Sequence, residues 1–446
     1  MRATRYLRLV RRQRTCGIFT KQWVYKAVLI LGGAFFIGHG TARGQLPENL
    51  SGGTRLSLIT VYPGDEIYSA FGHSAFRFQD PGSYDIVFNY GTFDADDPMF
   101  VAKFTYGKLD YKLSYSSMGA LLRSAEIETR TVVEQELDLS PKSIASLYAR
   151  LLENYKPENR YYRYDFLFEN CSTILRDLLV DSSNDVVILD STSTPAQSFR
   201  SLLQPYLNDR PLYDLGISMV LGSAVDRATT YDERMFLPIE LLNAFASANV
   251  ITRSDSTRYV RPLVPATVTL YSAGPTSLPE NRDLRLVWIL AGLGALWILG
   301  ARRVRVRAAA TEDRAAAAVE GRERRQRDIG DRILFGILGV GGVIFAFVWF
   351  ISEHSVGTRN ANLLWALPTH LLVAMVWRRL SARIWRPYWL FTGTLVVLVV
   401  ALQPFVAQPI HPALYPVLLI ILWRCSILIN FHTPVTQLSN NEVRSS

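Results

Sequence analysis

The chain has 446 residues, and its charged residues are unevenly distributed among three regions. Residues 1–44 carry nine Lys or Arg and no acid, residues 45–283 carry 21 basic and 31 acidic residues, and residues 284–446 carry 18 basic and eight acidic residues. A nucleic-acid-binding protein concentrates basic charge on its folded domain, so the acidic middle region excludes that class. Each region holds one of the three cysteines, Cys16, Cys171 and Cys425, which excludes a disulfide framework.

The N-terminus has the pattern of a secretion signal. Eight basic residues within the first 26 precede an apolar run at 27–37, and small residues follow at 40, 42 and 44, so we expect cleavage near Gln45. The apolar run is shorter than the roughly 20 residues that a membrane-spanning helix needs. Residues 1–44 are therefore predicted to be a signal peptide, with a retained signal anchor as the alternative.

The region after the signal begins with a predicted β-sheet. Segments rich in β-branched and aromatic residues occur at 54–61, 74–78 and 85–93, and further alternating segments occur at 108–116 and 126–138. Between the second and third segments, Asp80-Pro81-Gly82-Ser83 has the composition of a tight turn, which predicts an antiparallel hairpin. A helix is predicted at 141–154, with Ser140 as its N-cap and Pro141 at its first position.

Cys171 lies at the start of a second predicted helix. Asn170 is suited to cap that helix, which places Cys171 in its first turn, where unpaired N–H groups and the helix dipole favour an anion. A thiol in this position has a lowered pKa, and neighbouring N–H groups can hold an oxyanion formed beside the sulfur. The alternative is a buried inert thiol.

His73 is the one histidine between the signal and the membrane-spanning region. It follows Gly72 at the start of a predicted strand, and it would supply the base that a thiolate nucleophile needs. Asn89 lies across the predicted hairpin and can accept the second imidazole N–H, whereas Asp85 lies farther toward the turn. We therefore predict a dyad of Cys171 and His73 with Asn89 as the orienting residue. A surface histidine at a strand end is the alternative.

From residue 284 onward the sequence is dominated by long apolar segments. We predict five membrane-spanning helices, at about 284–300, 333–351, 362–377, 388–406 and 412–429. Ten arginines between 302 and 332 and four between 378 and 386 mark both loops as cytoplasmic. This topology places residues 45–283 outside the membrane as one domain, followed by a transmembrane domain at 284–430 and a cytoplasmic tail at 431–446. Residues 226–242 are predicted to be a helix-rich packing segment without chemistry.

The order of a histidine strand, a hairpin and an Asn-Cys helix resembles the circularly permuted papain-like fold of the NlpC/P60 type. Longer motifs resemble the Lnb-type bacterial lipoprotein N-acyltransferase family. They are Tyr68-Ser-Ala-Phe-Gly-His73-Ser-Ala-Phe-Arg77, Phe88-Asn-Tyr-Gly-Thr-Phe93, Phe168-Glu-Asn-Cys171-Ser-Thr173, Met235-Phe-Leu-Pro238-Ile-Glu-Leu-Leu242, Glu353-His354 and Asn360-Ala-Asn362-Leu-Leu-Trp365. The resemblance implies an α+β permuted papain-like extracytoplasmic domain followed by a five-helix transmembrane bundle.

The same resemblance implies transfer of a fatty acyl chain from a phospholipid to the α-amino group of a lipoprotein's S-diacylglyceryl cysteine, through a thioester on Cys171. It implies no metal or cofactor, membrane-bound lipid and lipoprotein partners, and a catalytic domain in the periplasm of a bacterial inner membrane. The residues expected to support the oxyanion or the dyad are Asn170, Ser172, Ser74 and Tyr90. On the outer membrane loop, His354, Asn360 and Asn362 are expected either to contact lipid headgroups or to cap and bridge helices.

Two other functions remain open. A membrane-anchored peptidoglycan peptidase or amidase of the NlpC/P60 type would use the same dyad, although five membrane helices exceed what an anchor needs. A catalytically inactive membrane scaffold is the non-enzymatic alternative.

Overall fold

The computed structural model describes residues 46–93, 99–108, 110–189, 196–254, 257–309, 314–377 and 382–429. The expected signal peptide, Cys16 and the expected tail at 431–446 lie outside these residues. The chain forms two compact units. Unit 1 contains the residues up to Asp209, Arg227–Asn281 and Glu353–Ser355, and unit 2 contains Arg210–Asp226, Arg282–Ser352 and the residues from Val356 onward. The segments 210–226 and 353–355 thus belong to the unit opposite to the one that their sequence position suggests.

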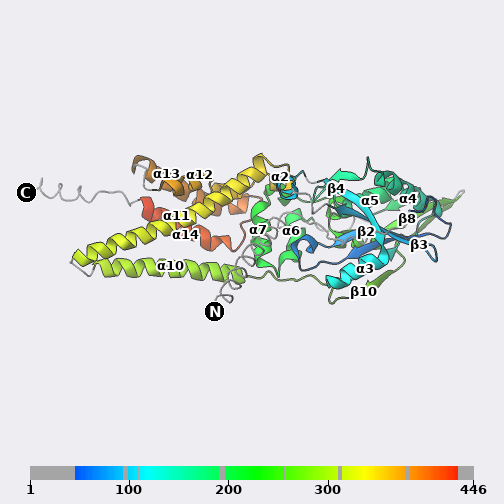
Figure 1. Cartoon of the computed structure of the whole chain (residues 1–446), viewed down its shortest axis with the longest axis horizontal. Coiled ribbons are helices and arrows are strands. Elements are labelled where there is room, and N and C mark those ends of the chain that lie inside the picture. The colour runs from blue at the N-terminus through cyan, green and yellow to red at the C-terminus, as the bar shows by residue number, and fades with distance from the viewer. Residues whose placement is uncertain are drawn as a thin grey trace, which may run out of the picture. The chain divides into compact units, whose positions relative to one another are not determined.

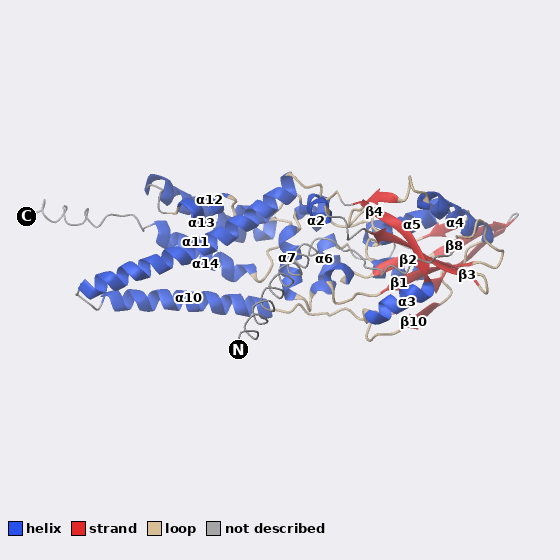
Figure 2. Cartoon of the chain, in the orientation of Figure 1, coloured by secondary structure: helices blue, strands red, loops and turns tan. Residues whose placement is uncertain are grey.

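Unit 1 is built on a mixed α/β arrangement with an antiparallel sheet (Figures 1 and 2). In the described residues this sheet has seven strands in the order β10-β5-β1-β2-β3-β4-β6. Their bounds are β1 (Arg55–Val61), β2 (His73–Asp80), β3 (Tyr84–Thr92), β4 (Asp110–Ser117), β5 (Val132–Glu136), β6 (Tyr161–Arg163) and β10 (Thr267–Tyr271). A smaller sheet contains β7 (Val186–Ile188), β8 (Asn249–Ser254) and β9 (Thr257–Pro262).

The predicted hairpin between β2 and β3 is confirmed. The two strands pair antiparallel, with Asp80 opposite Tyr84 and Phe76 opposite Phe88. The turn closes with a hydrogen bond from the Ser83 N–H to the Asp80 carbonyl, and Gly82 has a φ of 82°, which favours glycine. Turn chemistry and strand alternation therefore agree, and together they set the register of the strands that carry His73 and Asn89.

The prediction of a strand over 126–138 is wrong for the first part of that segment. A helix, α3 (Met118–Ile127), precedes the short strand β5. The Ser117 side chain caps α3 by accepting a hydrogen bond from the Ala120 N–H, and Leu121 and Ala125 are buried one helical turn apart. A second helix, α2 (Phe100–Tyr106), was also not predicted. Both helices are short, so their apolar periodicity is difficult to distinguish from strand alternation.

Helices cover both faces of the large sheet. Alternate side chains of β1, β2 and β3 form one core with α4 (Pro141–Tyr155), α5 (Cys171–Ser182) and α9 (Pro238–Ser247). The other alternate set, which includes Ile59, Ala75 and Val87, packs against α3. Helix α4 begins with Pro141 and is capped by Ser140, as predicted. The period-two alternation of a strand thus assigns each side chain to one of two cores.

Unit 1 also contains short helices that connect its sheets. They are η2 (Ile67–Ser69), α6 (Phe199–Leu203), η3 (Gln204–Leu207) and α8 (Tyr231–Arg234). Helices α8 and α9 fall within or begin within residues 226–242, so the predicted helix-rich packing segment is confirmed. Leu241 of α9 is fully buried against the large core.

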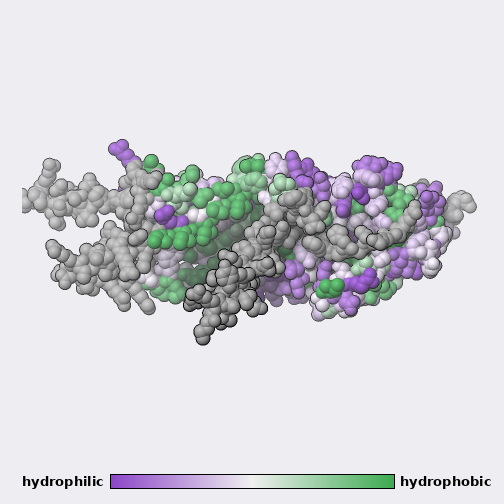
Figure 3. Space-filling view, in the orientation of Figure 1, coloured by the Kyte–Doolittle hydropathy of each residue, from purple (hydrophilic) through white to green (hydrophobic). Residues whose placement is uncertain are grey.

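Unit 2 is helical. Its elements are α7 (Pro211–Val220), η4 (Ser223–Asp226), α10 (Arg285–Ala309), α11 (Arg314–Phe350), η5 (Ser355–Gly357), η6 (Ala361–Leu364), α12 (Thr369–Val376), α13 (Ala382–Ala401), η7 (Gln403–Phe405) and α14 (Leu414–Ile429), of which η5 begins in unit 1. Two described helices, at Ile329–Phe350 and Arg383–Ala401, are long and apolar enough to cross a membrane, and shorter apolar helical segments occur at Arg285–Gly300, Ala361–Val376 and Leu414–Leu428. Much of the visible surface of these helices is hydrophobic (Figure 3).

The third predicted span is broken. The segment 362–377 contains the 3-10 turn η6 and the eight-residue helix α12, with Pro368 immediately before α12. Proline disfavours helical geometry in the residue before it, which separates the two pieces. The arginine-rich segment at 302–332, where the sequence favours a helical linker at 308–318, is mostly helix in α10 and α11.

Buried polar side chains join the helices of unit 2. Arg424 of α14 donates to both carboxylate oxygens of Asp331 of α11, each at 2.5 Å. Asp214 of α7 accepts from Arg282 at 2.7 Å and lies 3.1 Å from His411 Nε2. A buried carboxylate requires such partners, and these contacts explain why α7 belongs to this unit.

Candidate active site

Helix α5 presents Cys171 as its first residue. The Asn170 side chain accepts hydrogen bonds from the N–H groups of Ser172 at 2.8 Å and Thr173 at 3.0 Å, and the Thr173 hydroxyl accepts from the Asn170 N–H. The predicted N-cap is therefore confirmed, in a reciprocal capping box. The Asn170 amide also donates to the carbonyls of Phe166 and Phe236. Five hydrogen bonds thus fix the backbone that precedes the sulfur.

His73 begins β2 and is 2% exposed. Gly72 before it has a φ of 84°, and a Cβ there would lie 2.9 Å from the Val61 carbonyl oxygen. Glycine therefore permits both the backbone conformation and the close packing that turn the chain into the strand. His73 Nε2 lies 3.2 Å from Asn89 Oδ1 on β3. The two residues lie on the adjacent antiparallel strands β2 and β3, next to the segments Phe76–Asp80 and Tyr84–Phe88 that pair in register.

The contacts of Asn89 determine the tautomer of His73. The Asn89 Nδ2 group donates to the Val87 carbonyl at 3.2 Å and to Ser116 Oγ at 3.4 Å, so Oδ1 faces the imidazole. An oxygen in this position accepts, which places the imidazole proton on Nε2 and leaves Nδ1 as the basic nitrogen. The structure thus brings Asn89 to the position that the sequence predicts for it. Asp85, farther along the strand, is paired with Arg77.

Cys171 and His73 line the same small cavity, of about 30 Å³. The start of β2 meets the start of α5, where Ser74 Oγ lies 3.0 Å from Ser172 Oγ, and Ser172 Oγ lies 3.9 Å from the Cys171 sulfur. Both expected serines therefore lie beside the sulfur. The cavity has room for about one water molecule or a group of similar size. Its other walls are Tyr68, Phe71, Gly72, Tyr90, Gly91, Tyr164, Phe166, Asn170, Phe236 and Pro238.

Aromatic rings surround this cavity and continue away from it. The Phe71 ring lies 5.3 Å from that of Phe166 and 5.7 Å from that of Tyr206, and Phe166 contacts Phe236 at 5.8 Å. Tyr90 contributes its ring, but its hydroxyl accepts a hydrogen bond from Asn154 of α4. The wall next to the sulfur is therefore apolar and suited to hydrocarbon.

The expectation of a lowered thiol pKa is wrong. Burial raises the pKa of Cys171 above its usual value, although hydrogen bonds from the backbone N–H groups of Ser74 and Cys171, the Ser172 hydroxyl and the charge of Arg130 act in the opposite direction. Burial also lowers the pKa of His73, to about 3, although the hydrogen bond that His73 donates to Asn89 acts in the opposite direction. The resting pair is therefore a neutral thiol and a neutral imidazole, because the low-polarity site disfavours either charge.

The N–H groups around Cys171 are not all available to an oxyanion. Asn170 occupies the N–H groups of Ser172 and Thr173. Backbone hydrogen bonds of Ser74 and Cys171 instead act on the sulfur and lower the pKa of the thiol. Two backbone donors from two different elements can therefore hold a negative charge that develops beside Cys171.

Sequence reasoning missed Arg130, which is 1% exposed. Its guanidinium donates to the Tyr62 carbonyl at 2.8 Å and to Glu128 at 2.9 Å. Its charge acts on both members of the dyad, lowering the pKa of Cys171 and that of His73. Arg130 follows Thr129, which has a φ of 51°. No sequence motif marks it, because its proximity to the dyad arises from packing of the loop between α3 and β5.

The loop before Cys171 is held by residues that lie far away in the sequence. Asp165 Oδ1 accepts from the N–H groups of Leu167 and Phe168, and Asp165 Oδ2 accepts from Ser355 Oγ at 2.8 Å. Glu353 pairs with Lys108 and Arg163 in the same unit. The segment 353–355 therefore belongs to unit 1 through hydrogen bonds that end on the loop preceding Cys171. The half-buried His354 lies between these residues.

Asn360 and Asn362 lie in unit 2, whereas the dyad residues belong to unit 1. The Asn360 amide donates to the carbonyls of Met219 and Val220, and the Asn362 amide donates to the Met219 carbonyl. These carbonyls lie at the C-terminal end of helix α7, so the two asparagines cap that helix. Capping was one of the two roles that the sequence suggested for them. Both side chains are buried, at 2% and 6% exposed.

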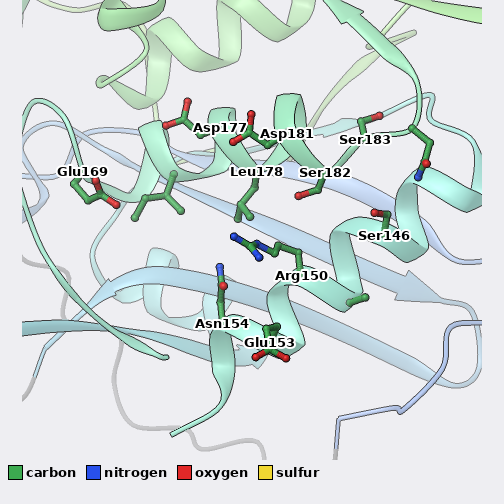
Figure 4. A pocket seen from close by; sticks show the side chains of 13 residues that line it. Ser146, Arg150, Glu153, Asn154, Glu169, Asp177, Leu178, Asp181, Ser182 and Ser183 are labelled. Atoms are coloured by element: carbon green, nitrogen blue, oxygen red, sulfur yellow. The ribbon is translucent and has the colours of Figure 1, made fainter. Parts of the chain in front are cut away.

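A larger hollow of about 680 Å³ lies between α4 and α5, away from the dyad. It is lined mainly by polar side chains, and Figure 4 shows Arg150 reaching from α4 toward α5 near Asn154 and Leu178. Neither Cys171 nor His73 lines it. Across the described ranges, no cluster of three or more His, Cys, Asp or Glu side chains could hold a metal ion.

Two protein-family models match the chain, one in each unit. The model of the Lnb N-terminal periplasmic domain matches residues 51–205, which contain His73, Asn89 and Cys171. The model of the Lnb transmembrane domain matches residues 315–433, which contain α12, α13 and α14 and nearly all of α11. No curated protein and no solved structure gives a significant match. The two matches cover more than half of the sequence, and the chain therefore belongs to the Lnb family, as a multi-pass membrane protein with a periplasmic N-terminal domain.

Proposed function

We propose that the protein is a lipoprotein N-acyltransferase of the bacterial inner membrane. It moves a fatty acyl chain from a phospholipid to the α-amino group of a lipoprotein's N-terminal S-diacylglyceryl cysteine. One observation carries this proposal: Cys171 and His73 line the same cavity. Cys171 is the first residue of α5, and the buried neutral imidazole of His73 is oriented by Asn89. Membership of the Lnb family supports the choice of substrates.

The first half-reaction acylates the enzyme. His73 Nδ1 takes the proton of the Cys171 thiol as the sulfur attacks the ester carbonyl of the phospholipid. The N–H groups of Cys171 and Ser74 hold the oxyanion. Collapse of the tetrahedral intermediate breaks the ester C–O bond, and His73 gives its proton to the departing lysophospholipid oxygen. The product is a thioester on Cys171.

The second half-reaction transfers the acyl chain. The lipoprotein amine attacks the thioester carbonyl, and His73 accepts a proton from the nitrogen. The C–S bond breaks, an amide forms, and His73 returns the proton to the sulfur. Protons balance over the cycle, and Asn89 keeps the imidazole in one tautomer throughout. The neutral resting pair suits this scheme, because each proton transfer accompanies a bond change rather than preceding it.

The fold assignment that accompanies this mechanism is a circularly permuted papain-like domain at 45–283, followed by a transmembrane domain at 284–430. The strand that carries the histidine precedes the helix that carries the cysteine, and α5 packs on the sheet beside β2. This order of elements supports the permuted arrangement. Membrane-bound substrates at both steps account for a catalytic domain joined to several apolar helices.

A product assay tests the function. The full-length protein in phospholipid nanodiscs is incubated with a diacylated lipopeptide, and mass spectrometry follows the peptide and the phospholipid. We expect one added acyl chain on the peptide amine and an equal amount of lysophospholipid, with neither product from Cys171→Ser. Cleavage of muropeptides without acylation would show a peptidase instead. Wild-type function of Cys171→Ser in cells would identify a scaffold.

A further inference from the structure

Unit 2 contains an apolar cavity of about 170 Å³ at one end of α13. The last two turns of that helix form one wall through Leu395, Leu398 and Val399, and Leu402 follows directly after the helix. The remaining walls come from η6 and from the segment after α13, and they comprise Ala361, Asn362, Leu364, Trp365, Gln403, Val406, Gln408, Pro409 and Ile410. The cavity is therefore enclosed by one helix and two non-helical segments.

The polar side chains around this cavity are bound within the protein. Gln408 accepts from the Ala361 N–H at 2.8 Å and donates to Asn360 and the Leu221 carbonyl. Gln403 accepts from the Ile410 N–H and donates to the Gln408 carbonyl. Asn362 accepts from the Trp365 indole at 3.0 Å. The lining thus offers mainly hydrocarbon to a ligand, and its non-helical walls are held in place by hydrogen bonds.

The cavity lies on the periplasmic side of the membrane. Arg383 and Arg386 at the first turns of α13 mark the cytoplasmic end of this span. Because α13 is apolar and long enough to cross a bilayer, its last two turns reach the opposite leaflet. The family model also assigns the N-terminal domain to the periplasm.

The ligand of this cavity comes from the surrounding lipid bilayer. Leu364, Leu398, Leu402 and Val406 line the cavity and are each 39–46% exposed on the surface of the membrane unit, so the cavity opens onto lipid. Apolar cavities of about 150 Å³ stay dry and accept a six-carbon hydrocarbon. A fatty acyl chain is the apolar ligand that surrounds this surface.

We propose that this cavity is a binding site for part of one fatty acyl chain of a phospholipid in the periplasmic leaflet. About six carbons of the chain enter between α13, η6 and residues 403–410. The site requires that α13 spans the membrane, and it does not depend on acyl transfer at Cys171. An acyl chain is already in an apolar environment in the bilayer, so it gains no hydrophobic free energy on entering the cavity. Its binding depends on van der Waals contacts with the walls, and the cavity therefore selects a chain by its shape.

Photocrosslinking tests the site. Full-length protein with Cys171→Ser, which the proposed mechanism makes unable to turn over lipid, is placed in nanodiscs that contain a phospholipid with a diazirine at the end of one acyl chain. We expect crosslinks to concentrate on residues that line the cavity. Leu395→Trp and Leu398→Trp each fill the cavity and are expected to reduce this crosslinking at least fivefold.

Val397→Trp is the matched control. Val397 is 51% exposed on the same helix and does not line the cavity, so crosslinking is expected to stay within twofold of the parent. Crosslinks spread evenly over exposed α13 residues such as Leu390, with the three variants alike, would overturn the proposal. Displacement of the label by excess diacylated lipopeptide would assign the site to the acceptor instead. Since binding is read without turnover, failure of the acyltransferase assay leaves this result unaffected.

Discussion

Asn89 holds His73 through a hydrogen bond between Oδ1 and the imidazole Nε2, 3.2 Å apart, in a site that excludes water from both side chains. The contact orients the ring and leaves Nδ1 unprotonated. Its partner atoms Val87 O and Ser116 Oγ prevent the amide from presenting its NH₂ group to the histidine. The Asn89 side chain therefore fixes the ring orientation and the tautomer that the proposed mechanism requires of His73.

Replacing Asn89 tests this contact. Asn89→Ala removes the acceptor, and we expect kcat to fall by about tenfold to a hundredfold, below the full effect of a general base. KM for the lipopeptide should change little, because Asn89 does not line the cavity. Steady-state kinetics in nanodiscs measures both constants. A normal kcat for Asn89→Ala would contradict the orienting role, and Ser116→Ala, which removes only the longer 3.4 Å bond, is the milder control.

The pH dependence of Cys171 alkylation tests the neutral pair. Burial raises the pKa of the Cys171 thiol above its usual value and lowers the pKa of His73 to about 3, so no thiolate–imidazolium pair is expected near neutral pH. The rate of reaction with iodoacetamide should then be low at neutral pH and increase only at a more alkaline pH than for an ordinary exposed thiol. A preformed ion pair would instead give a rate plateau at neutral pH. Observation of that plateau would show that the active-site charges differ from those described.

The acid limb of acyl transfer follows from the same shifts. The pKa of His73 is lowered, so the imidazole remains unprotonated as the pH falls below 6.5 and loses its basic form only near 3. We expect kcat/KM to show no acid limb near pH 6.5. A limb at that value would contradict the lowered pKa and would mean that the histidine is solvated during turnover.

Arg130 is predicted to tune the thiol. Arg130→Gln removes a buried positive charge that favours the thiolate, so the alkylation limb should move to higher pH and kcat should fall by about tenfold, equivalent to about 1.4 kcal/mol. Arg130→Lys keeps the charge and should restore part of the rate. Glu128→Gln removes the ion-pair partner while keeping Arg130, and it serves as the control for folding. A loss of stability without a shift of the pH limb would limit Arg130 to a structural role.

The segment 353–355 is predicted to position the nucleophile loop. Ser355→Ala removes the hydrogen bond to Asp165, and we expect a loss of about 1 kcal/mol of stability and a lower kcat with unchanged KM. Ser352→Ala is a matched control, because the Ser352 hydroxyl donates to the carbonyl of Val348, four residues earlier in the sequence. Thermal unfolding and kinetics of the two variants should separate them. Equal behaviour would exclude a positioning role for Ser355.

Local signals in the sequence predicted the elements that carry the dyad. The turn at 80–83, the cap at Asn170 and the alternation of β2 and β3 act over a few residues, and each is present in the structure. The sequence also distinguished the apolar helices of unit 2, although the third span is interrupted beside Pro368. These features depend on neighbouring residues, which is why they were accessible.

Features set by tertiary packing were not predicted. The pKa of Cys171 depends on burial by segments as distant as Phe236, and that burial outweighs the helix N-terminus. Asp165 and Ser355 are 190 residues apart. Arg130 approaches the dyad through a loop after α3, a helix that the sequence pattern did not indicate. No local rule predicts contacts of this kind.

The most direct test of the central claim is detection of the acyl-enzyme. Full-length protein is incubated in nanodiscs with a phospholipid that carries an isotope-labelled acyl chain, without acceptor, and then quenched in acid and digested. We predict a labelled acyl group on the peptide that contains Cys171, removable by hydroxylamine, absent from Cys171→Ser and consumed when lipopeptide is added. Acylated lipopeptide formed at the wild-type rate by Cys171→Ser, with no label on the wild-type peptide, would contradict the account.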